Sequence, residues 1–64
     1  MNYQEVWDIA HAIGYHQGRM LKVRNTRAVK VDREAFDSFL KLVPAPWANT
    51  AIRARDAGIT AGAI

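Results

Sequence analysis

The chain contains no cysteine, only one serine and no long apolar run, and each of these absences excludes a class of protein. Without cysteine, no disulfide can reinforce the fold, and such a composition is typical of a reducing, cytoplasmic compartment. No apolar stretch approaches the roughly 20 residues that cross a bilayer, and the acidic N-terminal segment lacks the basic start of a signal peptide. We therefore expect a cytoplasmic protein without a membrane span.

Little in the sequence indicates catalysis. Ser38 lies inside a helical pattern, without the strand-to-helix turn that exposes a nucleophilic serine, and the four glycines are too scattered for a phosphate loop. His11 and His16 are five residues apart, whereas two metal ligands on one helix need a spacing of three or four. We expect no enzyme, no metal site and no cofactor.

With 64 residues, the chain has room for a single domain, residues 1–64, whose core is small. Half of the residues are hydrophobic, which makes disorder an unfavourable interpretation. Many of these residues are alanine, however, and alanine buries little surface. Formation of a homodimer is therefore a further source of stability to consider.

Positive charge is concentrated in the middle of the chain. Residues 19–33 hold six bases and one acid, a net charge of +5, whereas the other residues together carry −2. The bases are Arg19, Lys22, Arg24, Arg27, Lys30 and Arg33. Such asymmetry indicates a polyanionic partner.

Helical patterns flank this basic segment. The apolar spacing predicts a helix over residues 3–16, and Asp32 is a suitable cap for a second helix that Pro44 ends. A third helix is predicted from Trp47 to Ala57, with Gly58 as its stop. The expected core residues of the second helix are Phe36, Phe39 and Leu40.

Between the first two helices, residues 20–31 alternate between apolar and basic side chains, which is the periodicity of a strand. A hairpin with Asn25-Thr26-Arg27 as its loop puts Leu21, Val23, Val29 and Val31 on one face. The opposite face carries Lys22, Arg24 and Lys30. This pattern predicts an α+β domain, helix–β-hairpin–helix–helix, and a two-stranded ribbon fits the major groove of DNA.

An alternative is a mainly α fold with a helix-turn-helix unit, which residues 6–25 resemble. Ile9, Ala10, Ile13 and Gly14 match the apolar, small, apolar and glycine positions of that motif, and Met20 and Val23 match its later core positions. The resemblance implies a recognition helix over residues 16–24. Gln17, Arg19 and Lys22 would then face the bases.

Two functions follow as hypotheses. The first is non-enzymatic binding of nucleic acid, in particular regulatory DNA binding, through the six bases of residues 19–33. The alternative is a small inhibitor or adaptor, of the kind that phages encode, which docks on an acidic surface of a host protein.

Overall fold

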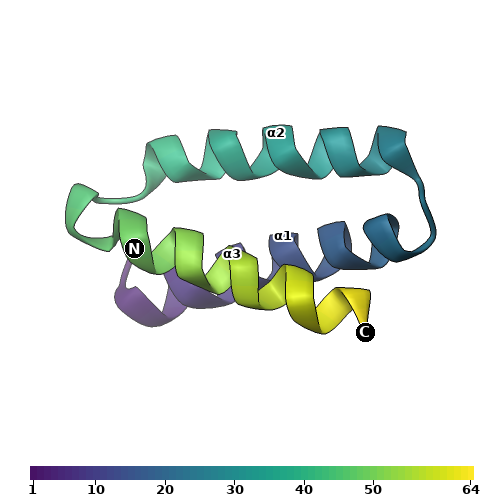
Figure 1. Cartoon of the computed structure of the whole chain (residues 1–64). Helices are drawn as coiled ribbons and strands as arrows, with labels where there is room; N and C mark the ends of the chain where they lie inside the picture. Colours follow the sequence, from purple (N-terminus) through teal and green to yellow (C-terminus); the bar gives the residue numbers. More distant parts are fainter.

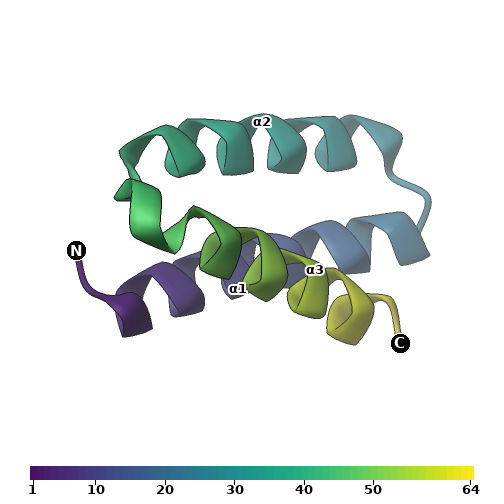
Figure 2. The same cartoon turned by 60° about the vertical axis from the view of Figure 1, so that its left-hand side comes forward.

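The computed structural model describes all 64 residues and contains three α-helices and no strand. Helix α1 spans Tyr3–Lys22, α2 spans Thr26–Leu42 and α3 spans Ala48–Ala63, and a short 3-10 turn, η1 (Ala45–Trp47), links α2 to α3. Helices α1 and α3 lie side by side and run in the same direction, whereas α2 runs the opposite way (Figures 1 and 2). The predicted α+β fold is therefore wrong, and the mainly α alternative is right.

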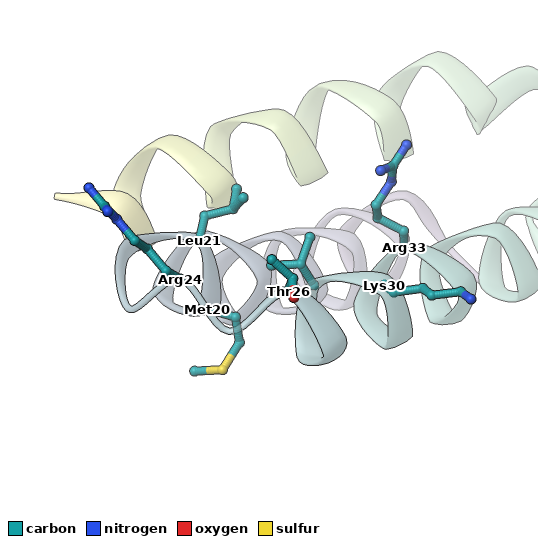
Figure 3. A pocket seen from close by; sticks show the side chains of 7 residues that line it. Met20, Leu21, Arg24, Thr26, Lys30 and Arg33 are labelled. Carbon is teal, nitrogen blue, oxygen red and sulfur yellow. The ribbon is translucent and has the colours of Figure 1, made fainter.

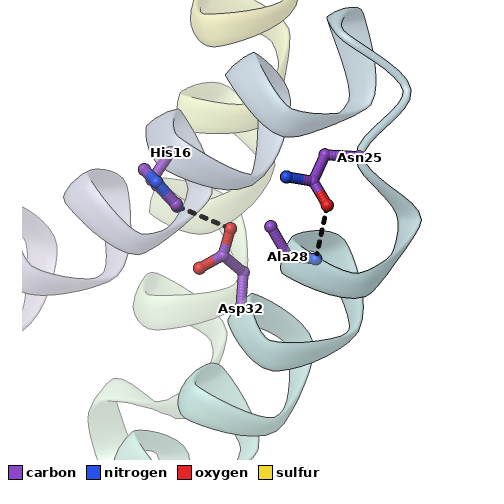
Figure 4. A network of polar contacts seen from close by, with 4 residues as sticks. All are labelled: His16, Asn25, Ala28 and Asp32. Atoms are coloured by element: carbon purple, nitrogen blue, oxygen red, sulfur yellow. Dashed lines mark hydrogen bonds and ion pairs between the residues drawn. The ribbon is translucent and has the colours of Figure 1, made fainter.

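The predicted hairpin over residues 20–31 consists of the end of α1, a tight turn and the start of α2. Asn25 does not form a hairpin loop but caps α2, because its side-chain oxygen accepts a hydrogen bond from the Ala28 amide at 3.1 Å (Figure 4). Asp32, predicted to cap this helix, lies in its second turn. Three of the four residues of the supposed buried face are exposed, with 46% of Leu21, 63% of Val23 and 58% of Val31 accessible to solvent, and the fourth, Val29, is half-buried.

The helix-turn-helix unit predicted over residues 6–25 is also wrong in its detail. Helix α1 continues without a break from Tyr3 to Lys22, so residues 16–24 do not form a separate recognition helix. Gln17, which was expected to face DNA bases, is only 7% exposed. The glycine that matched the turn of the motif, Gly14, is buried inside α1.

Helices α1 and α3 meet through small residues spaced four apart. Ala10, Gly14 and Gly18 on α1 face Ala54, Gly58 and Gly62 on α3, and all six are buried. A Cβ atom on Gly14 would lie 2.0 Å from the carbonyl oxygen of Arg55, and one on Gly58 would lie 2.3 Å from that of His11. Only glycine permits this approach of the two backbones. Gly58 was predicted to end the third helix, but α3 continues to Ala63, and Gly58 serves instead as a contact point with α1.

The hydrophobic core lies in the half of the bundle that contains the N-terminus and the link between α2 and α3. Phe36 and Phe39 of α2 are buried there, as predicted, whereas Leu40 is only half-buried. The other buried core residues are Val6, Ala10, Val43, Ala51 and Ala54. No residue of α2 before Phe36 is buried, so the first half of this helix contributes no side chain to the hydrophobic core.

Candidate nucleic-acid interface

All six bases of residues 19–33 lie in the half of the molecule that contains the turn between α1 and α2. Arg19 and Lys22 belong to the last turn of α1, and Arg24 lies in the turn itself. Arg27, Lys30 and Arg33 belong to the first half of α2. The predicted positive face is thus not one side of a hairpin but one end of a helical bundle, which we call the basic end (right-hand side of Figure 1).

The side chains of the basic end are exposed, and none of the six forms an ion pair. Lys22 donates a hydrogen bond to the carbonyl oxygen of Ile64 at 2.7 Å, and the other five form no hydrogen bond through their side chains. The one acid in the segment, Asp32, instead accepts a 2.7 Å hydrogen bond from His16 of α1 (Figure 4). The positive charge is therefore not neutralised within the chain.

Arg24 adopts a backbone conformation that normally favours glycine. Its φ angle is 58°, the only positive value in the chain. The amide of Arg24 donates to the Leu21 carbonyl at 3.1 Å and that of Asn25 donates to the Met20 carbonyl at 2.9 Å, the Schellman pattern that ends a helix. A side chain in this left-handed conformation costs roughly 1 kcal/mol, so a cation occupies a position where glycine would be more stable.

The start of α2 also places charge against its electrostatic preference. The positive end of a helix dipole stabilises acids and disfavours cations by about 0.3–1 kcal/mol each. The first turn of α2 contains no acid, whereas it does contain Arg27. Residues that reduce local stability concentrate at functional sites. The basic end has two such residues, Arg24 with its positive φ angle and Arg27 at the positive end of the α2 dipole, and its charge is not neutralised.

A groove of about 460 Å³ opens beside the turn, between the last turns of α1 and the first turns of α2 (Figure 3). Seven residues line it: Met20, Leu21, Arg24, Thr26, Val29, Lys30 and Arg33. Three of them are apolar and three are cationic, and no acid is present. The sequence did not reveal this groove, because the strand interpretation placed Leu21 and Val29 inside a core.

Aromatic side chains are absent from the groove. Trp7 stacks on His11 with the ring centres 4.7 Å apart, and Trp47 packs against the core in the opposite half of the molecule. None of the six aromatic residues lines the groove. The groove therefore offers no aromatic ring on which an unpaired base could stack.

No three His, Asp or Glu side chains come together as metal ligands would. None of the helices has both the length and the hydropathy that a membrane span requires. No protein family, curated protein or solved structure matches the chain.

Proposed function

We propose that this chain is a non-enzymatic protein that binds nucleic acid by its phosphates, through the basic end. The observation that carries the proposal is that five cationic side chains at this end have no partner. Arg24 and Arg27 add to it, because both occupy positions where a cation costs stability. Phosphate oxygens are suitable ligands for such a set, since arginine and lysine contacts to them release counterions.

The proposed phosphate contacts would position the protein on nucleic acid, and they would not distinguish one base sequence from another. Neither the hairpin nor the separate recognition helix exists, so we limit the proposal to phosphate contacts. Single strands are usually held by base stacking on aromatic rings, and no aromatic ring lines the groove. A duplex, in particular DNA, is therefore the expected ligand. We also propose a cytoplasmic location, with which the absence of cysteine is consistent.

Fluorescence anisotropy with a labelled DNA duplex tests the proposal. Binding should weaken steeply between 50 and 200 mM salt, because each neutralised phosphate contributes about −0.9 to the slope of log K against log salt. The double variant Arg19→Gln, Arg27→Gln should reduce the magnitude of this slope by about 2. Both substitutions lie outside the groove, so they leave its lining intact.

The matched control is Lys41→Gln, Arg53→Gln, which removes two exposed bases from outside the basic end. This control should bind with nearly the affinity of the unaltered protein. Equal losses in the two double variants would mean that only net charge matters and would overturn the assignment to this end. Binding that does not depend on salt would contradict phosphate contacts and favour the alternative, an acidic protein partner.

A further inference from the structure

We propose that the groove beside the α1–α2 turn is a binding site for a small anionic amphiphile, namely an aliphatic carboxylate. The groove joins an apolar lining to a cationic rim within one space of about 460 Å³. Sites for small organic ligands usually have volumes of about 300–1,000 Å³ and combine an apolar wall with a few polar groups. The size and the lining of the groove both agree with such a site.

The apolar part of the ligand would lie on Leu21 and Val29, because Figure 3 shows Met20 extending to the opposite side of α1 from Leu21. Leu21 is 46% exposed, so its side chain leaves apolar surface in water that a hydrocarbon chain would cover. Leu21 and Val29 are aliphatic, so they favour contact with a hydrocarbon chain over contact with a polar group.

The charged part of the ligand would lie beside Arg33, whereas Figure 3 shows Arg24 and Lys30 extending from opposite ends of the groove. None of these three side chains has a hydrogen bond or ion pair within the chain. The planar guanidinium of an arginine presents paired donors that match the two oxygens of a carboxylate. Figure 3 shows Arg33 and Leu21 extending toward the same side of the groove, the side where α3 lies, so one ligand can contact both.

This site shares three bases with the proposed nucleic-acid interface. An amphiphile bound there would neutralise Arg33 and add negative charge to the basic end, and it would thereby lower the affinity of this end for phosphates. The ligand would act as an effector that releases nucleic acid. This regulatory consequence rests on the proposed function, whereas binding of the amphiphile itself does not.

A titration followed by the backbone amide resonances of the protein tests the site, with decanoate as the probe. We expect saturable shifts that are concentrated at Met20 to Arg24 and Thr26 to Arg33. Decanol, which has the chain without the charge, and propionate, which has the charge without the chain, should each bind at least tenfold more weakly. Equal binding of decanol, or shifts centred outside the groove, would overturn the proposal.

Two double variants separate the two proposals. Lys30→Gln, Arg33→Gln removes cations from the groove and should weaken decanoate binding at least tenfold, whereas Arg19→Gln, Arg27→Gln should leave it nearly unchanged. Unaltered decanoate affinity in the first variant would contradict the role of the rim. In the unaltered protein, decanoate should displace labelled duplex. If decanoate fills the groove without displacing the duplex, the effector role is wrong while the site stands.

Discussion

Gly14→Ala is the substitution that most sharply tests the packing of α1 on α3. Alanine is the better helix former by about 1 kcal/mol, so an exposed glycine in a helix would gain stability from this change. Gly14 is not exposed, and its added Cβ would lie 2.0 Å from the carbonyl oxygen of Arg55 and 2.8 Å from the carbonyl carbon. Both atoms belong to the backbone of α3, so no side chain can turn aside to make room.

The expected loss follows from these distances. Ordinary van der Waals contact begins at 3.4 Å, so α3 would have to move by about 1.4 Å along this direction. Overpacking in a core typically costs about 1–3 kcal/mol, and displacement of a whole helix belongs at the upper end of that range. After subtraction of the gain in helix propensity, the net loss should be about 2 kcal/mol, or a fall of about 8–16 °C in melting temperature for a domain of this size.

Thermal unfolding followed by circular dichroism measures this loss. The control is Ala57→Gly at an exposed position of α3, which should cost about 1 kcal/mol and calibrates the propensity contribution within the same protein. If Gly14→Ala melted at or above the temperature of the unaltered protein, the close contact between the two helix backbones would not exist as described.

Three further substitutions test the strained Arg24, the buried Phe36 and the buried Gln17. Arg24→Gly should relieve the strain of the left-handed conformation and stabilise the protein by about 0.5–1 kcal/mol, and it should also weaken duplex binding. Lower stability with unchanged duplex binding would contradict the idea that Arg24 reduces stability for the sake of binding. Phe36→Ala, at a side chain that is 2% exposed, should cost about 3–5 kcal/mol in chemical denaturation, and a loss below 1 kcal/mol would place the core elsewhere. Gln17→Leu should stabilise the fold by about 1 kcal/mol, because the buried Oε1 atom has no hydrogen-bond partner, and marked destabilisation would show that this atom is satisfied.

The parts of the fold that were predictable depend on strong local signals. Phe36 and Phe39 recur at helical spacing and are buried, and α2 ends just before Pro44, where proline would remove a hydrogen bond of the helix. The clustering of the bases was also visible in the sequence, because it depends only on their positions along the chain.

The segment from residue 20 to residue 31 misled the prediction for an identifiable reason. Its β-branched residues alternate with bases, but alternation predicts a strand only where one face is buried, and Leu21, Val23 and Val31 remain exposed. Asn25 has a side chain suited to either a turn or a helix cap, and the cap prevailed.

The pairing of α1 with α3 was missed although its signal is present in the sequence. Alanine and glycine recur every four residues at Ala10, Gly14 and Gly18, and again at Ala54, Gly58 and Gly62. Taken singly, Gly18 and Gly58 indicate helix ends. Considered as two matching series, they predict two helices in close contact, which is the arrangement that the structure has.

Mapping the backbone amide resonances during a titration with a short DNA duplex shows whether the basic end is the surface that binds nucleic acid. The perturbed amides should cluster between Arg19 and Arg33, and those of Ala48 to Asp56 in α3 should stay nearly unchanged. Perturbations centred on the first half of α3, around Arg53 and Arg55, or no perturbation at low salt, would contradict this placement of the nucleic-acid interface.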